Sequence, residues 1–480
     1  MIALKRQSRM VEFWKTVGTR YLPFADVATA DLPLGRLLRL TMFQISIGMA
    51  AVLLTGTLNR VMIVELGIPT SIVALMVAIP VLAAPFRILI GHRSDNHKSL
   101  LGWRRVPYVW LGTLLQFGGL AIMPFGLLLM NSQTVGPEWA GAVGVAVAFL
   151  LTGIGMHMAQ TAGLALATDL AAEENRPRVV ALAYVMLLVG MMLSAGAFGL
   201  LLTDFSAIRL IQVIQGAAVV TLVVNVVALW KQEPRNREVT DPNRELMPFT
   251  QAFRRYTADK RTARLLIAVG LGSAAFAMQD VLLEPYGGEV LGLSVSQTTM
   301  LTALWSLGTL IGLGFAARML SLGRDMHRTA AMGALIGVFA FSAVIFAEPL
   351  HMVHLFRAGT FLIGLGGGIF AVSTMLAAME ISESSDAGIA IGAWSAVQAT
   401  SIGLALAAGG FIRDAVNYFL PTASDLSSAL SSPAGGYSVV YHIEIGLLFA
   451  SLIALGPLVG RKLDTKTQHP RKFGLVELPG

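Results

Sequence analysis

The feature that most constrains this chain is a series of apolar segments, each long enough to cross a lipid bilayer. A membrane-spanning helix needs about 20 consecutive, mostly apolar residues. Because backbone groups in lipid must form hydrogen bonds within the segment, each one is predicted to be an α-helix. The sequence thus predicts an all-α membrane protein with twelve transmembrane helices. The segments lie at about 41–66, 70–91, 106–130, 141–168, 179–202, 207–230, 265–290, 297–320, 329–348, 355–379, 388–412 and 438–460.

The composition excludes several classes of protein. Only 13% of the residues are charged and 55% are hydrophobic, whereas soluble domains carry about 25% charged residues. The chain contains no cysteine, which excludes thiol nucleophiles, Cys-ligated zinc and iron–sulfur clusters. The net charge of +7 comes from basic residues in the loops between apolar segments. We therefore expect the lipid bilayer as its surroundings, and neither a soluble enzyme nor a nucleic-acid partner.

Lysine and arginine are distributed unevenly between the two sides of the predicted bundle. With the N-terminus inside, all but four of the 35 Lys and Arg residues fall on the inner side. The exceptions are Arg60, Arg209, Arg357 and Arg413. The positive-inside rule then predicts that both termini are cytoplasmic.

An internal repeat divides the chain into two six-helix halves. Phe149–Gly155 in the fourth segment matches Phe361–Gly367 in the tenth, at an offset of 212 residues. A parallel repeat of six spans is typical of the major facilitator architecture. The predicted parts are a cytoplasmic arm (1–40), an N-terminal half (41–230), a central cytoplasmic loop (231–264), a C-terminal half (265–460) and a cytoplasmic tail (461–480).

The cytoplasmic loop after the second segment supports this architecture. It contains Gly91, Asp95, Gly102, Arg104 and Arg105, which resemble the facilitator loop motif of glycine, aspartate, glycine and paired basic residues. The six residues between Asp95 and Gly102 make a longer gap than usual. An ordinary positive-inside loop would not need the two glycines and the aspartate, so we favour the motif.

Small residues predict where helices approach closely. Ala195-x-x-x-Gly199 lies in the fifth segment and Gly308-x-x-x-Gly312 in the eighth. In the facilitator architecture these two segments meet between the halves, as do the second and the eleventh, and the latter contains Gly388-x-x-x-Gly392. We expect these glycines to be packing residues.

The N-terminal arm carries an amphipathic pattern. Met10, Phe13, Trp14, Val17 and Tyr21 recur at helical spacing with basic residues between them. This pattern predicts an interfacial helix on the cytoplasmic leaflet. A docking helix for a partner is the alternative.

Ionisable residues within spans are costly and point to functional sites. The first segment contains Arg60 and Glu65, and the seventh contains Asp280 and Glu284. These two segments face each other in the facilitator architecture, so Arg60 is expected to pair with Asp280 or Glu284. A buried arginine needs such a partner. We favour a structural clasp that holds the outer side shut over a substrate site.

One histidine of eight, His157, lies near the middle of a span, beside Met156. A neutral imidazole can bind the magnesium of a flat macrocycle, or it can form a hydrogen bond to a neighbouring helix, and both interpretations stay open. Gln160 lies one turn away and could support such a ligand. Asn59 and His442 are further candidates. We find no other metal site and no catalytic constellation, so no enzyme activity is expected.

Three stretches carry a resemblance to a known family. Thr55–Gly67, Gly91–Tyr108 and Gln160–Asp169 resemble the PucC and LhaA assembly proteins of purple phototrophic bacteria, the bacteriochlorophyll-delivery branch of the facilitator superfamily. The resemblance covers about 40–460. Two further stretches, Arg20–Asp26 and Leu210–Gly216, look more like the LhaA type, which serves the core antenna LH1.

The resemblance implies a non-enzymatic assembly factor that handles bacteriochlorophyll a. Its implied partners are the antenna α and β polypeptides and the reaction centre–LH1 core, in the bacterial inner or intracytoplasmic photosynthetic membrane. The family supplies no pigment-binding residues, so His157, Gln160, Met156 and Asn59 are our own inference. Two alternatives are a proton-coupled transporter of a small solute, working through Arg60, Asp280 and Glu284, and a pigment-free scaffold for antenna assembly.

Overall fold

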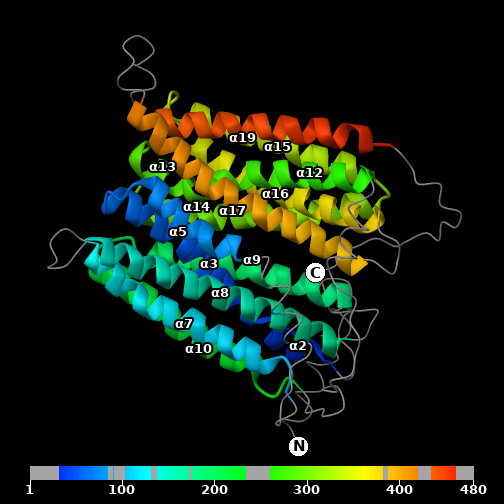
Figure 1. The fold of residues 1–480 in the computed structure, drawn as a ribbon, viewed down its shortest axis with the longest axis horizontal. Helices are drawn as coiled ribbons and strands as arrows, with labels where there is room; N and C mark the ends of the chain where they lie inside the picture. Colours follow the sequence, from blue (N-terminus) through cyan, green and yellow to red (C-terminus); the bar gives the residue numbers. More distant parts are fainter. Residues whose placement is uncertain are drawn as a thin grey trace, which may run out of the picture.

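A computed structural model shows an all-helical bundle (Figure 1). It describes residues 32–84, 90, 94, 103–130, 138–171, 176–233, 260–381, 387–419 and 434–460, and no strand occurs among them. Eleven of the described helices are long and apolar enough to cross a membrane. A shorter apolar helix lies at the position of the second segment. The predicted all-α class is confirmed.

The N-terminal half begins with an interrupted helix and continues with five more. The first segment consists of α2 (Leu34–Thr41), α3 (Phe43–Val52), the π-helix η2 (Leu53–Thr57), α4 (Leu58–Arg60) and the π-helix η3 (Val61–Glu65). The others are α5 (Thr70–Leu82), α7 (Val106–Leu129), α8 (Glu138–Leu170), α9 (Arg176–Leu201) and α10 (Ala207–Leu229).

The C-terminal half repeats this order, and its first segment is also interrupted. That segment consists of α12 (Lys260–Ala277), the 3-10 helix η7 (Met278–Val281) and α13 (Leu283–Glu289). The others are α14 (Val295–Ser321), α15 (Met326–Ala347), α16 (Val353–Ile381), α17 (Ala387–Phe419) and α19 (Ala434–Leu455), followed by η9 (Gly456–Leu458).

Glycines allow equivalent helix pairs to cross closely in both halves. A side chain on Gly112 of α7 would lie 2.7 Å from the backbone oxygen of Gly155 in α8. In the other half, a side chain on Gly333 of α15 would lie 2.7 Å from the backbone oxygen of Gly366 in α16. These are spans three and four, and nine and ten. The internal repeat seen in the sequence is thus a repeat of helix packing.

The predicted contacts between the halves are partly confirmed. Gly410 of α17 packs against Ala74 of α5, so the second and eleventh spans meet. Gly199 of α9 packs against Met300 of α14, so the fifth and eighth spans meet. Gly308 and Gly312 are packing residues as expected, but they lie against the backbone of α16 within their own half and not against the fifth span.

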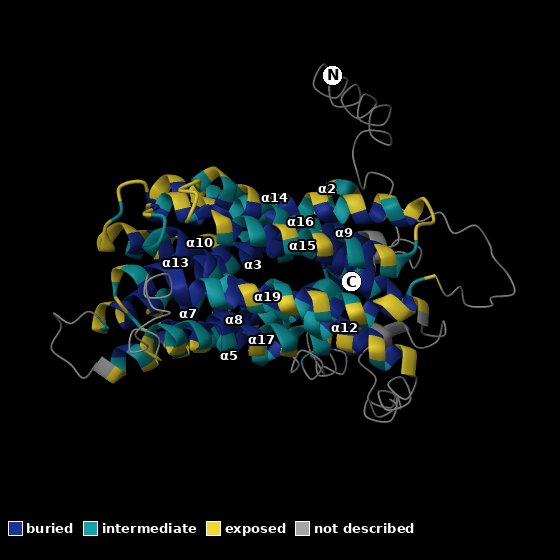
Figure 2. Ribbon diagram, turned by 90° about the horizontal axis from the view of Figure 1, so that it is seen from above, coloured by how far each residue is buried: buried dark blue, intermediate teal, exposed yellow. Residues whose placement is uncertain are grey.

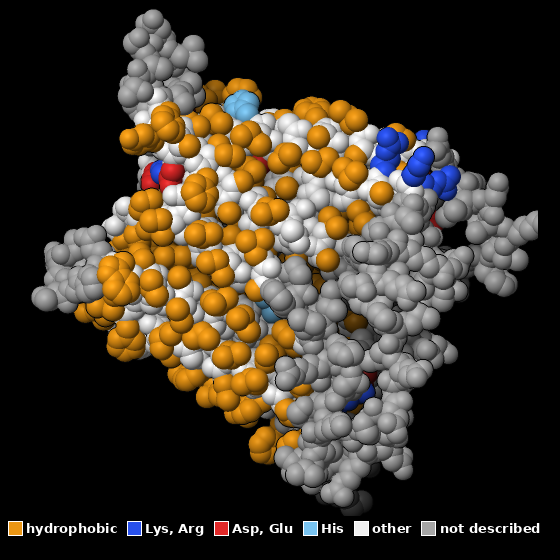
Figure 3. All heavy atoms as spheres, in the orientation of Figure 1, with side chains coloured by type: hydrophobic (Ala, Val, Ile, Leu, Met, Phe, Trp, Pro, Cys, Tyr) orange, Lys and Arg blue, Asp and Glu red, His pale blue; other side chains and the backbone are white. Residues whose placement is uncertain are grey.

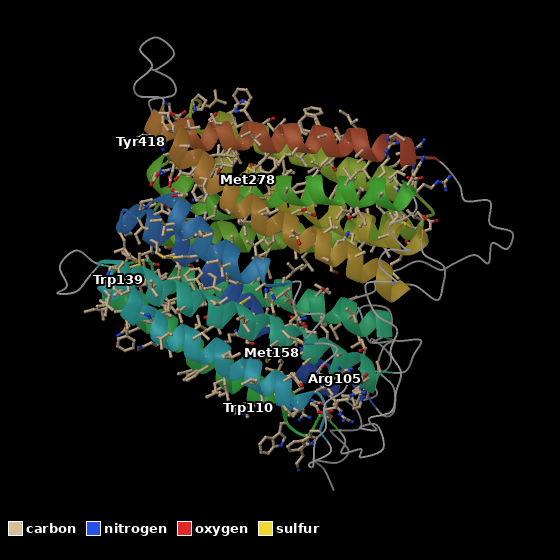
Figure 4. All side chains as sticks on the ribbon, viewed as in Figure 1. Arg105, Trp110, Trp139, Met158, Met278 and Tyr418 are labelled. Atoms are coloured by element: carbon tan, nitrogen blue, oxygen red, sulfur yellow. The ribbon has the colours of Figure 1, made fainter. Side chains whose placement is uncertain are left out.

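The two ends of the bundle are distinct. We call the end where α2 begins the Leu34 end, and the end where η3 finishes the Glu65 end. In Figure 4, Arg105 and Trp110 lie toward the Leu34 end, whereas Trp139 and Tyr418 lie at the Glu65 end. Trp139 is 69% exposed and Tyr418 is 77% exposed. Aromatic side chains at both ends of an apolar bundle are typical of membrane interfaces.

The outside of the bundle is apolar between these ends. Figure 2 shows buried residues within the bundle and exposed ones on its outside. In Figure 3, hydrophobic side chains cover the visible face of the described helices, and Lys and Arg side chains gather at the Leu34 end. Single apolar residues reach high exposure, such as Ile453 at 77% and Phe339 at 70%. This surface fits a bilayer.

Several sequence predictions fall on residues outside the described ranges. The amphipathic helix around Met10 to Tyr21 is one of them. Gly91, Asp95 and Gly102 of the loop motif are others. Most of the central loop and the whole C-terminal tail also lie outside, so these parts stay predictions.

Candidate functional site

The first span approaches the seventh through its two π-helical turns. Such turns inside α-helices occur frequently at functional sites. Gly56 lies in η2, and a side chain at this position would meet the carboxylate of Glu284 and the hydroxyl of Thr302. The predicted meeting of the first and seventh spans is therefore confirmed, and glycine is the residue that allows it.

The seventh span is interrupted where it meets the first. Met278 begins the 3-10 helix η7 at this break and is labelled in Figure 4. The side-chain nitrogen of Asn59 donates hydrogen bonds to the backbone oxygens of Asp280 (3.2 Å) and Thr55. The Gln279 side chain donates to the Asp280 carboxylate. Interrupted helices of this kind form the ion and substrate sites of many transporters.

A further carboxylate, not predicted from the sequence, lies at this place. Glu444 of α19 is fully buried, and neither of its carboxylate oxygens has a hydrogen-bond partner. The backbone N–H of Gln279 approaches this carboxylate without the geometry of a full hydrogen bond, and the negative charge of Asp280 is close enough to interact with it. The sequence does contain a signal for this residue, because Glu444 is the one acidic residue within the long apolar run of α19. Acidic residues within membrane spans mark functional sites. We call Asn59, Gln279, Asp280 and Glu444 the mid-span cluster.

Glu284 lies one turn beyond Asp280 and is also buried. One of its carboxylate oxygens accepts a hydrogen bond from the Thr302 hydroxyl. Its other oxygen, Oε2, has no partner. The two acids in the middle of the seventh span, Asp280 and Glu284, therefore accept hydrogen bonds from polar side chains and form no ion pair with a described basic residue.

The predicted pairing of Arg60 with Asp280 or Glu284 is wrong. Arg60 forms an ion pair with Glu65 of its own segment and donates to the backbone oxygen of Leu293 (3.2 Å). The reason is the π-helix η3, whose hydrogen bonds join residues five apart and bring Glu65 back over Arg60. Its guanidinium lies against Gly288 of α13, so Arg60 still links the two halves.

This geometry changes the expected result of a charge exchange. Arg60→Ala should lower stability by about 1–3 kcal/mol, because it removes charge-assisted hydrogen bonds while Glu65 stays accessible to water. Arg60→Glu combined with Glu65→Arg should recover part of the loss, whereas Arg60→Asp with Asp280→Arg should not. The readouts are the amount of protein in the membrane and the Tm in detergent. Recovery with Asp280→Arg would contradict the observed pairing.

The Glu65 end has a clasp, but different residues form it. Arg413 of α17 forms ion pairs with Glu289 of α13 and with Asp414 (3.0 Å). Glu289 also accepts from the hydroxyl of Tyr437 (2.8 Å). The Asp414 carboxylate accepts from the backbone N–H of Ser71, at the start of α5 in the other half (2.7 Å). These contacts form a clasp centred on Arg413, which was not predicted from the sequence, in place of the predicted clasp of Arg60 with Asp280 or Glu284.

His157 makes the predicted hydrogen bond between helices. Its Nε2 lies 2.9 Å from the backbone oxygen of Pro80 in α5. The Pro80 ring packs against Gly153 of α8, one turn before His157. Pro80 lies in the last turn of α5, where backbone carbonyls lack intrahelical donors. Whether His157 also binds magnesium stays a prediction.

The other pigment candidates are not brought to one place. Gln160 is buried and donates to Gln44 of α3 (3.4 Å), and Met156 is half-buried in the apolar core. Asn59 belongs to the mid-span cluster. His442 is exposed, and its Nδ1 lies 2.7 Å from the backbone oxygen of Ser438. Among the described residues no group of three or more His, Cys, Asp or Glu could hold a metal ion.

The paired arginines of the loop motif bind the end of the fourth span. Arg104 and Arg105 both form ion pairs with Asp169 of α8. The carboxylate of Glu233, which follows α10, accepts from the backbone N–H groups of Arg104, Arg105 and Val106 and thereby caps α7. These contacts tie three helices together at the Leu34 end.

A pocket beside this capped helix was not foreseen from the sequence. Its volume is about 430 Å³, and it opens between α7 and α10 at the Leu34 end. The lining is mainly apolar and includes Trp103, Trp110 and Trp230, with Lys231 at the turn that follows α10. Such a pocket could accept an apolar group of a membrane ligand.

Comparison with known proteins identifies relatives along nearly the whole chain. The family model described as "PUCC protein" matches residues 57–463. An "Uncharacterized protein in puhA-bchM intergenic region" of Rhodobacter capsulatus is 54% identical, covering 97% of this chain and 98% of its own length. "Protein PucC" of Rhodovulum sulfidophilum is 52% identical, covering 91% and 96%. A "Bacteriochlorophyll synthase 44.5 kDa chain" of Rhodobacter capsulatus is 28% identical, covering 88% and 98%.

Solved structures share the fold at low sequence identity. The nucleoside transporter NupG has a TM-score of 0.63 and is 12% identical, covering 89% of this chain and 100% of its own. A bacterial homologue of the iron transporter ferroportin, in an inward-facing state, has a TM-score of 0.64 and is 14% identical, covering 89% and 100%. These similarities support the predicted facilitator architecture.

Proposed function

Because this chain is a multi-pass membrane protein that belongs to the PucC family, we propose that it is an assembly factor for light-harvesting antennae and that it handles bacteriochlorophyll. The observation that carries the proposal is that the family model and the relatives named Protein PucC match most of the chain. The name of a more distant relative, a bacteriochlorophyll synthase chain, supports a link to the pigment. The protein acts as a carrier or scaffold and not as an enzyme.

The proposed clients are the antenna α and β polypeptides, with the core antenna LH1 favoured, and the reaction centre–LH1 core. The proposed location is the bacterial inner membrane or the intracytoplasmic photosynthetic membrane. The Leu34 end then faces the cytoplasm, which the distribution of basic residues supports. The apolar outer surface offers the antenna helices a face within the bilayer.

His157 fits the role of a ligand to the magnesium of bacteriochlorophyll a. It lies within α8, it is neither sealed in the core nor fully exposed, and one of its ring nitrogens is held by the Pro80 carbonyl. A hydrogen bond at one ring nitrogen is what fixes the orientation of metal-binding imidazoles. The pigment supplies the light-absorbing macrocycle, and the protein supplies the imidazole and apolar neighbours such as Met156.

Replacing this histidine tests the pigment site. His157→Leu should lower the pigment bound per protein by about tenfold or more, because even changes in outer-shell support cost about 10–100-fold in metal affinity. Met158→Leu, at the next position of the same helix, is the matched control and should retain the pigment. The measurement is the near-infrared absorption relative to the amount of purified protein. An unchanged near-infrared band in His157→Leu would show that His157 is not the ligand, and the next candidate site would be the pocket lined by Trp103, Trp110 and Trp230.

The function itself is tested by purification from a phototrophic host in mild detergent. We expect a near-infrared bacteriochlorophyll band together with antenna α and β polypeptides, and reduced LH1 in a deletion strain. Antenna polypeptides without pigment would favour the scaffold alternative. A colourless protein without antenna polypeptides, with normal LH1 in the deletion strain, would overturn the proposal and favour a small-solute transporter.

A further inference from the structure

The mid-span cluster contains more hydrogen-bond acceptors than donors. Four of its side-chain oxygens have no hydrogen-bond partner: Oδ1 of Asn59, Oε1 of Gln279, and both carboxylate oxygens of Glu444. Asn59, Gln279 and Glu444 are each at most 1% exposed. Buried polar atoms are normally satisfied, and each exception needs an explanation.

The orientations of the two amide groups follow from their contacts. The Asn59 nitrogen faces two backbone oxygens, those of Thr55 and Asp280. The Gln279 nitrogen faces the backbone oxygen of Phe276 (3.3 Å) and the Asp280 carboxylate. Exchanging nitrogen and oxygen in either amide would place oxygen against oxygen. The oxygens left over are therefore true acceptors without donors.

The two carboxylates of the cluster have no basic partner among the described residues. Arg60 is paired with Glu65, and Arg413 is paired with Glu289 and Asp414. Two uncompensated negative charges within a membrane-spanning bundle would cost several kcal/mol each. Since no described basic residue pairs with them, their charge is best neutralised by a bound proton or cation.

Local backbone structure fits a small cation. The α-helical pattern of the seventh span is interrupted by the 3-10 helix η7, which contains Gln279 and Asp280, and the Asp280 backbone oxygen lies beside the Asn59 side chain. In transporters, interruptions of membrane-spanning helices often form Na⁺ or proton sites. Asp280 is the one member of the cluster that is partly accessible, so a cation can reach the cluster at this residue. Hard cations prefer carboxylate and carbonyl oxygens.

We propose that Asn59, Gln279, Asp280 and Glu444 form a binding site for a monovalent cation between the two halves of the bundle. The site takes up Na⁺ or a proton, because each cancels one of the two negative charges. A proton on the second carboxylate completes the neutralisation in either case. The two amide oxygens favour Na⁺, since a single protonated carboxyl has one O–H donor and can satisfy only one of them. Binding there joins the first, seventh and twelfth spans and stabilises their contact.

The test compares the stability of the purified full-length protein in NaCl and in choline chloride at equal ionic strength. Adding about 100 mM Na⁺ should raise the Tm of the wild-type protein by about 3 °C or more, because a ligand that binds the folded state stabilises it. Glu444→Gln and Asp280→Asn should remove this response without lowering the Tm in choline chloride. Asp204→Asn, at a position 90% exposed in the side chain, is the control and should respond as the wild type does.

A second measurement separates the two cations. Where Na⁺ has no effect, proton uptake by unbuffered protein should be measured between neutral and alkaline pH with a pH indicator. The titratable groups that face Glu444 are Asp280 of η7 and Tyr441 of its own helix, and Tyr286 and Tyr437 lie next to Tyr441. If Glu444→Gln takes up one proton fewer than the wild type, and Tyr441→Phe takes up as many as the wild type, the proton binds at Glu444.

Two results would overturn the proposal. One is the absence of both a Na⁺ response and a proton that depends on Glu444 or Asp280. The other is a Na⁺ response that is equal in the wild type and in both variants, which would place the cation elsewhere. Neither result depends on pigment or on antenna polypeptides, so this test is independent of the assembly function.

Discussion

Replacing Arg413 with alanine is expected to destabilise the protein by about 3 kcal/mol, because the change leaves two acidic groups without their cation. Arg413 is 13% exposed, and Glu289 and Asp414 are each 21% exposed in their side chains. Its guanidinium also lies over the ring of Tyr437, 4.8 Å from the centroid. We expect a lower Tm in detergent and less protein in the membrane.

The matched control is Arg209→Ala at an exposed ion pair. The side chains of Arg209 and Asp204 are 44% and 90% exposed, and such surface pairs contribute about 0–1 kcal/mol. Adding Glu289→Gln to Arg413→Ala should recover part of the loss, because the stranded charge is removed. If Arg413→Ala is as stable as Arg209→Ala, the clasp at the Glu65 end has no energetic importance.

The second large effect is expected at the crossing of α7 and α8. In Gly112→Leu the new Cβ would lie 2.7 Å from the backbone nitrogen of Ala159 and from the backbone oxygen of Gly155. Backbone atoms cannot move aside as side chains do, so the helices must separate. Overpacking of this kind costs about 1–3 kcal/mol and sometimes more, and a leucine adds further atoms to the clash.

Gly118 of the same helix is the control for this substitution. No atom lies within 4 Å of a Cβ built there. Gly118→Leu should be neutral, or stabilising by up to about 1 kcal/mol, since glycine is a poor helix former. The measurement is the Tm of both variants in the same detergent. A Gly112→Leu protein that unfolds at the wild-type temperature would show that the two helices do not cross as described.

The sequence was sufficient for the fold class because a bilayer imposes a simple rule. Each span must be about 20 apolar residues long and helical. The repeat at Phe149–Gly155 and Phe361–Gly367 then indicated two similar halves, which the glycine crossings confirm. The approach of the first span to the seventh followed from the same architecture. The residues proposed as pigment ligands remain predictions, because nothing in the fold tests them.

The faces of the helices could not be predicted in the same way. In water, the polar side of a helix identifies its exposed face, but in lipid both faces are apolar. Gly308 and Gly312 of the eighth span were therefore expected to pack against the fifth span, although they pack against the tenth. A glycine marks a close contact without naming the helix that it contacts.

What the sequence alone determined is thus the helical class, the order of the apolar spans and the family of the chain. Only the tertiary structure decided which charged groups meet. Arg60 pairs with Glu65 because a π-helix shifts the register that α-helical spacing assumes. Glu444 joins Asp280 from a span more than 150 residues away in sequence. Such contacts depend on the packing of helices that are far apart in the sequence, and the spacing of residues within one segment does not predict that packing.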